Sequence, residues 1–195
     1  MMRSELPIWN SNTYNTYMKK VTSILLCLPC AGILLLDDSY AQTRSFGATF
    51  SYAGIGAEYA LDIDEENFAE FHLRMDTMET FRTSSAMSGI SASAFWNIVF
   101  ARFESHNGNP VRLYAGPGIS LGYAADFISP YGLNFGVKGR IGGECAFPRG
   151  ISVAMSISPM VGGHFGIVDG MVNMRLYKNG LLQALMPEVS IRHRF

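Results

Sequence analysis

From Gln42 to the C-terminus, apolar and polar residues of this chain alternate one by one over long stretches. Segment 69–76 shows the pattern most clearly, with apolar Ala69, Phe71, Leu73 and Met75 against Glu70, His72, Arg74 and Asp76. A period of two is typical of β-strands, whose successive side chains point to opposite faces. No window after Gln42 is apolar for long enough to cross a membrane as a helix. The sequence therefore predicts strands with one apolar and one polar face.

Eight such stretches are separated by turn-forming residues: 45–52, 55–63, 69–76, 90–103, 111–127, 133–147, 151–165 and 181–195. Their lengths are near or above the ~9–11 residues that a tilted transmembrane strand needs. An even number of strands returns both ends of the chain to the same side. Short turns at 64–67, 106–110 and 148–150 are then expected on that side. Segments 53–54, 79–89, 128–132 and 166–180 are expected on the other side. The fold class predicted is all-β: a closed eight-stranded antiparallel up-and-down transmembrane β-barrel.

The segment before Gln42 has the layout of a secretory signal peptide. Residues 18–41 read as two lysines, an apolar run interrupted by Pro29, and a small-x-Ala site that predicts cleavage after Ala41. The apolar run is shorter than the ~20 residues of a membrane-spanning helix. Residues 1–17 are interpreted as an upstream extension outside the fold, so the domain expected is 42–195. Cleavage would leave Cys145 as the single cysteine, which excludes an intramolecular disulfide.

The end of the chain resembles the closing strand of bacterial outer-membrane barrels, because Val189, Ile191, His193 and Phe195 share one face and Phe195 is terminal. Together with the alternation over 42–195, the likeness is to small eight-stranded barrels of the OmpA transmembrane-domain and OmpX kind. The resemblance implies residence in the bacterial outer membrane, contact with its lipid, and recognition of Val189, Ile191, His193 and Phe195 by the barrel-insertion machinery. A soluble β-sandwich or lipocalin, whose apolar faces would point inward, is the alternative.

Charged residues gather on the parity that would face the lumen. The inward acids are Glu58, Asp62, Glu70, Asp76, Asp126, Glu144 and Glu188, and the inward bases are Arg74, Arg112, Lys138, Arg140, Arg192 and Arg194. An eight-stranded barrel is only wide enough for side chains to fill it. These groups, with His72, are therefore predicted to form an ion-paired plug, and the alternative is a narrow ion or proton path. Phe95, Val99 and Phe103 fit the inward parity poorly, and bulges are expected at Pro117, Pro159 and Pro187.

The remaining function classes are narrowed by composition. The net charge of -1 and the absence of a basic run argue against nucleic acid as a partner. His72, His164 and His193 lie among scattered serines without a fixed nucleophile–base spacing, so no catalytic residue, metal ligand or cofactor is predicted. We expect a non-enzymatic, monomeric barrel with a charge-plugged lumen. Its role would be structural, or it would recognise an unknown extracellular ligand or protein through loops 79–89 and 166–180. A lipid A-modifying enzyme is the alternative.

Overall fold

The computed structural model of the chain describes residues 43–52, 54–76, 89–126, 129–168, 171–182 and 186–195. The extension at 1–17, the signal peptide at 18–41 and its cleavage site at Ala41 lie outside these ranges and stay predictions. Within the described residues, no helix is both long and apolar enough to pass through a membrane.

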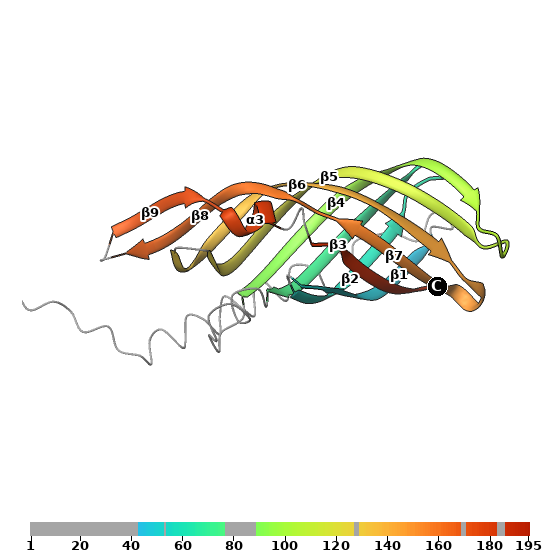
Figure 1. Cartoon of the computed structure of the whole chain (residues 1–195), viewed down its shortest axis with the longest axis horizontal. Coiled ribbons are helices and arrows are strands. Elements are labelled where there is room, and N and C mark those ends of the chain that lie inside the picture. Colours follow the sequence, from blue (N-terminus) through green and yellow to red (C-terminus); the bar gives the residue numbers. More distant parts are fainter. Residues whose placement is uncertain (1–42, 53, 77–88, 127–128, 169–170, 183–185) are drawn as a thin grey trace, which may run out of the picture. The chain divides into compact units, whose positions relative to one another are not determined.

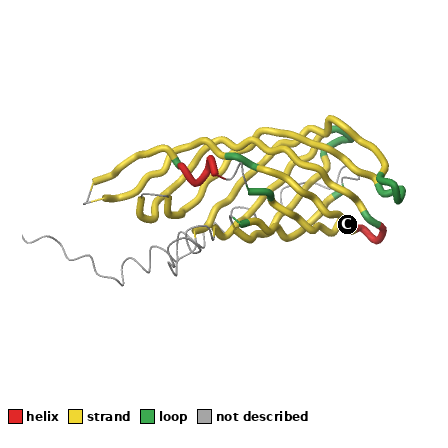
Figure 2. The backbone as a smooth tube through the Cα atoms, in the orientation of Figure 1, coloured by secondary structure: helices red, strands yellow, loops and turns green. Residues whose placement is uncertain are grey.

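The strands form one closed antiparallel barrel (Figures 1 and 2). They are β1 (Arg44–Ser51), β2 (Gly54–Asp62), β3 (Asn67–Asp76), β4 (Gly89–Glu104), β5 (Pro110–Asp126), β6 (Ser129–Ala146), β7 (Ile151–Ile157), β8 (Met160–Val168), β9 (Met171–Leu176) and β10 (Glu188–Arg194). β10 pairs with both β1 and β7, and β5 pairs with β6, so the ladder returns on itself. β7 and β8 follow one another along β6 and together occupy one strand position, and β9 pairs only with β8. The closed wall therefore has eight strand positions, as predicted.

Pro159 divides the predicted strand 151–165 into β7 and β8. β6 pairs with both parts in one register, with Ile141 opposite Ile157 and Lys138 opposite Met160. A proline has no N–H to donate to a ladder, but its carbonyl still accepts, here from the Gly139 N–H at 3.1 Å. The interruption is therefore local. The bulge predicted at Pro117 is wrong, because β4 and β5 keep the same register on both sides of this residue.

The polarity of the barrel is the reverse of that of a typical soluble protein, with apolar side chains outside and charged side chains inside. Large apolar side chains are exposed on the outer surface all around the wall, among them Phe46, Ile55, Phe71, Trp96, Ile119, Val137, Met155, Val161 and Ile191. Charged side chains fill the interior, and Glu58, Glu70, Arg140, Glu144 and Arg192 are each 3% exposed or less. The soluble alternative required apolar faces that point inward, and this arrangement contradicts it.

Several predicted boundaries were wrong for identifiable reasons. In the first hairpin Gly54 already belongs to β2 and pairs with Ser51, so the predicted turn at 53–54 is wrong at Gly54. β6 begins at Ser129, so most of the predicted turn 128–132 is strand. Phe103 is exposed rather than inward, since the β4–β5 register shifts between Val99 and Ala101 and reverses the parity.

The last predicted loop and strand differ most from the structure. Loop 166–180 contains the end of β8 and the whole of β9, and a short helix, α3 (Lys178–Leu182), follows. The closing strand accordingly begins at Glu188 instead of Leu181. Short apolar runs such as Leu181-Leu182 occur in helices and in strands alike, so the sequence pattern does not distinguish the two.

The turn between β2 and β3 is organised by Asp64. Its carboxylate accepts the backbone N–H groups of Glu66 at 2.8 Å and Asn67 at 2.7 Å, and the Asn67 side-chain amide at 3.0 Å. The hydrogen bond from the Asn67 amide is the main reason that the pKa of Asp64 lies below its ordinary value. Such a side-chain-to-backbone turn explains why the four residues 63–66 suffice to connect the two strands.

We expect the closing seam to tolerate no side chain at Gly47. A Cβ at this position would lie 2.3 Å from the Ile191 backbone oxygen across the β1–β10 pair, whereas a Cβ at Gly139 would meet nothing within 4 Å. We expect the folded barrel to resist SDS at room temperature, because a closed ladder has no edge from which to unfold. Gly47→Val should abolish this resistance, and Gly139→Val should retain it. Gel mobility with and without boiling measures this. Equal behaviour of the two variants would contradict the prediction.

Candidate functional site

Five strands contribute charged side chains to one network inside the barrel. β2 carries Glu58 and Asp62, and β3 carries the alternating set from Glu70 to Asp76. β5, β6 and β10 complete it with Arg112, Lys138, Arg140, Glu144, Glu188, Arg192 and Arg194. The period of two places all of them on the inner face. The network therefore follows directly from strand alternation and barrel closure.

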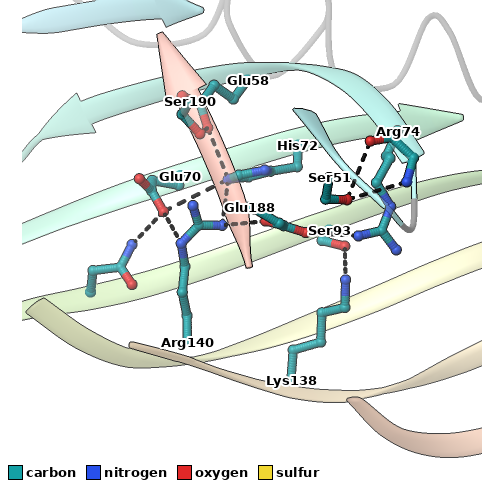
Figure 3. Close-up of polar contacts among 12 residues, drawn as sticks. Ser51, Glu58, Glu70, His72, Arg74, Ser93, Lys138, Arg140, Glu188 and Ser190 are labelled. Carbon is teal, nitrogen blue, oxygen red and sulfur yellow. Dashed lines mark hydrogen bonds and ion pairs between the residues drawn. The ribbon is translucent and has the colours of Figure 1, made fainter. Parts of the chain in front are cut away.

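The centre of the network is built on two carboxylates and two arginines, of which Figure 3 labels Glu58, Glu70 and Arg140. Arg192 Nε lies 2.5 Å from Glu58 Oε1, and its Nη2 also contacts Glu70 Oε1. Arg140 Nε lies 3.1 Å from Glu70 Oε2. Neutral groups complete the coordination of these carboxylates: Ser190 donates to Glu58 at 3.0 Å and Asn97 donates to Glu70 at 2.8 Å. The last two residues were not predicted as members, although both lie on the inward parity.

Toward the end of the barrel that holds the C-terminus, Glu144 forms ion pairs with three arginines. Arg112 Nη2 lies 2.7 Å from Glu144 Oε2, and Arg194 Nη2 lies 2.9 Å from Oε1. Arg192 reaches the same carboxylate at 3.4 Å and so joins this group to the centre. Arg112 also bonds Asp62 at 2.9 Å. The contacts of Arg112 and Arg194 with Glu144 are short enough for charge-assisted hydrogen bonds.

Toward the other end, Glu188 connects the centre to β3. Its carboxylate lies 3.6 Å from Arg140 Nη1 and 2.8 Å from Arg74 Nη1. Arg74 also bonds Asp76 at 2.9 Å. Together with the groups around Glu144, this makes one continuous series of ion pairs along the lumen.

Phe95 has a place inside the lumen despite its poor fit to the polar parity. The Arg140 guanidinium lies 5.0 Å and the Lys138 ammonium 5.8 Å from the centre of its ring, and His72 meets it edge to face at 5.3 Å. These are distances at which an aromatic face attracts cations. The opposite residue on β5 is Gly118, where a Cβ would lie 2.4 Å from the ring. The glycine leaves the space that Phe95 occupies.

Two predicted members of the network have other partners. Asp126 is buried, but its carboxylate accepts the backbone N–H groups of Lys178 at 3.2 Å and Asn179 at 3.0 Å at the start of α3. Unbonded N–H groups at a helix start commonly take such a partner. Lys138 donates to the Ser93 hydroxyl at 3.2 Å. Neither interaction could be foreseen, because α3 was not predicted and Ser93 carries no charge.

The three candidate histidines lie in different surroundings. His72 Nε2 lies 3.1 Å from Arg140 Nη1, which can only donate, so this nitrogen accepts. His164 contacts the Ala124 carbonyl at 2.9 Å, and His193 is exposed on the outer face. Among the described residues, none of the three hydrogen-bonds to a serine hydroxyl, the contact that an activated serine needs.

Glu58, Glu70 and His72 offer ligand atoms within 4.8 Å of one another, a spacing that a metal ion could use. The same atoms already face Arg140 and Arg192 at ion-pair distances. A divalent cation there would lie beside two buried guanidinium groups that can neither lose their charge nor move into water. The donor set therefore fits the two arginines and not a metal.

The residues predicted to form the assembly signal lie together on the outer face of β10. Val189, Ile191, His193 and Phe195 are all exposed. The backbone of Phe195 pairs with Arg44 through bonds of 2.9 and 3.3 Å. The final aromatic is thus held where the first and last strands meet, and its reading by the insertion machinery stays a prediction.

Comparison with known proteins gives no assignment. No protein-family model matches the chain, and no curated protein matches its sequence. A barrel fold by itself hosts many unrelated functions. Function must therefore be inferred from the inner network and the outer surface.

Reversing one central charge should destabilise the barrel strongly. Arg140→Glu would place a carboxylate beside Glu70 and Glu188, and leaving buried charges unpaired costs about 3–5 kcal/mol. The matched control is Arg149→Glu in the exposed turn η1 (Pro148–Gly150). Urea unfolding of the folded proteins, followed by tryptophan fluorescence, gives the two free energies. Equal values would show that the network does not support the fold.

Proposed function

We propose that this chain is a bacterial outer-membrane barrel whose lumen is sealed by ion pairs, and that it serves as a structural component of that membrane. The observation that carries the proposal is the inverted polarity: exposed apolar side chains surround the wall, while buried Arg–Glu pairs fill the interior. In water, this surface would be an aggregation hazard. In a bilayer, closure helps because β1 to β8 and β10 each pair with a neighbour on both sides, so these strands present no open edge to hydrocarbon within the described residues.

Aromatic residues support this placement. At the end with the C-terminus, Phe100, Phe103, Phe147 and Phe195 are exposed. At the other end Tyr52 is exposed, and Tyr123 and Tyr131 stack with ring centres 6.2 Å apart. Membrane barrels carry such aromatic belts at both interfaces. β1, β2 and β3, with eight to ten residues, are near the ~9–11 that a tilted crossing requires.

The proposal does not include catalysis or conduction. The ion pairs bridge the lumen from Glu144 through Glu70 to Glu188 and leave the charged groups bonded to one another. A lipid A-modifying activity would need a serine or other nucleophile beside one of the histidines. Recognition through loop 79–89 falls almost entirely on residues 77–88, which lie outside the described ranges, and remains a prediction.

Fractionation tests the location. The mature protein should be recovered from outer membranes with Gln42 as its first residue, since cleavage is expected after Ala41. Deletion of Phe195 should prevent insertion, because it removes the aromatic where β1 and β10 meet. Phe147→Ala, which changes another exposed aromatic near the same end, is the control and should insert normally. A protein found in the soluble periplasmic fraction would contradict the proposal.

Planar-bilayer recording tests the sealed lumen. The reconstituted protein should show no steady conductance, because the ion pairs fill an interior that is only as wide as its side chains. A larger porin inserted in the same way serves as the positive control. A stable ohmic conductance from the folded, heat-shiftable protein would favour the narrow ion path.

A further inference from the structure

Helix α3 contacts inward-facing groups of β5 and β8, two strands that β6 separates. On β5, the buried Asp126 carboxylate accepts the backbone N–H groups of Lys178 at 3.2 Å and Asn179 at 3.0 Å. On β8, a Cβ at Gly180 would lie 2.8 Å from the backbone oxygen of Met160, a residue that is 1% exposed. A helix that reaches the inner faces of both strands lies across the lumen. This end of the barrel is the one away from the C-terminus.

The residues that make this crossing are buried, although the sequence placed them in the outer loop 166–180. Tyr177 is 3% exposed and Asn179 is 2% exposed, and Gly180 is buried as well. The Tyr177 ring stacks on His164 of β8, with ring centres 6.1 Å apart and 13° between the planes. These residues therefore cover the inner wall at this end of the barrel.

Helix α3 is held in place by fewer interactions than a strand of the wall. It has five residues, whereas an isolated helix is marginal even at ~12–15 residues. Its stability must therefore come from its contacts. The two hydrogen bonds to the Asp126 carboxylate are of the charge-assisted kind, and the Asn179 side-chain amide adds a bond to the Ala125 carbonyl at 3.2 Å. Asp126 is thus the main anchor of the helix.

Polar atoms near this crossing oppose the closed arrangement. His164 Nε2 lies 2.9 Å from the Ala124 carbonyl, which can only accept, so Nε2 carries the proton and the Nδ1 of a neutral ring is left to accept. Asn134 is the pair partner of His164 on β6. Neither His164 Nδ1 nor Asn134 Nδ2 has a hydrogen-bond partner within the described residues, and both side chains are at most 1% exposed. Burial of unpaired polar atoms is unfavourable, so the anchor at Asp126 works against a real cost.

We propose that α3 is a lid that opens and closes the lumen at the end away from the C-terminus, and that Asp126 holds it closed. Opening admits water and small polar solutes to inward groups of β5, β6 and β8. The ion pairs around Glu144 lie toward the other end and stay in place. The lid requires only the folded barrel, so it is independent of the proposed membrane location.

Thiol modification in the refolded full chain tests the lid. The three native cysteines are replaced by serine, and Ala124→Cys introduces a reporter. Ala124 is 3% exposed and lies two residues before Asp126 on the same face of β5. Ser152→Cys is the matched reporter toward the other end, since Ser152 is 0% exposed and pairs with Arg192. The rate of reaction with a water-soluble methanethiosulfonate is measured for each, and the shift in gel mobility on boiling shows that each variant is folded.

The Ala124→Cys thiol should react slowly while Asp126 is present. Asp126→Ala should raise its rate at least about tenfold, because both hydrogen bonds to the carboxylate are lost. Asp126→Asn keeps one accepting oxygen and should give an intermediate rate. The Ser152→Cys thiol should react at the same slow rate in all three backgrounds.

Two results would overturn the lid. One is an Asp126→Ala chain that keeps its mobility shift and reacts no faster at Ala124→Cys. The other is equal acceleration at Ser152→Cys in a folded variant, which would mean that the whole interior has loosened. If Asp126→Ala does not fold, Tyr177→Leu replaces it under the same criteria, because it removes the stack on His164 and leaves the Asp126 carboxylate in place.

Discussion

Pairing of Arg140 and Arg192 with Glu58 and Glu70 is the interaction on which the rest of the barrel depends. Closing eight strands forces every second side chain into a space that side chains alone fill. If those residues were apolar, the chain would be apolar on both faces. If they were charged and unpaired, each would cost several kcal/mol. A network in which the central carboxylates each meet an arginine at about hydrogen-bond distance resolves this conflict.

The neutral inward residues adjust the space around these charges. Gly118 has no side chain, which leaves space for the Phe95 ring beside Arg140 and Lys138. Nearer the C-terminal end, Phe68 and Tyr114 meet edge to face at 5.0 Å, and Arg112 lies 4.2 Å from the Phe68 ring centre. The aromatic rings thus occupy volume that water would otherwise fill and supply electron-rich faces to cations.

The alternation of apolar and polar residues predicted the barrel, its eight-stranded wall and the inward side chains of Glu70, Arg74, Arg140 and Arg192. Alternation predicts the face of a side chain reliably because a register shift of two residues leaves each side chain on the same face. The prediction failed where a β-bulge adds one residue to a strand and reverses which side chains point inward. The bulge at Val99 and Ala101 moved Phe103 outward. Partners within the lumen could not be predicted, since the sequence does not state which strands face each other across the barrel.

Helix α3 explains a charge imbalance that the sequence left open. The predicted lumen held seven acids against six bases, but Asp126 bonds the first N–H groups of α3 and belongs to the mouth of the barrel. Among the described residues, the remaining set is balanced: Glu58, Asp62, Glu70, Asp76, Glu144 and Glu188 against Arg74, Arg112, Lys138, Arg140, Arg192 and Arg194. β1 ends at Ser51, so a longer β10 would have no partner there. The chain instead pairs β9 with β8, and Asp126 fixes the helix that leads back to β10.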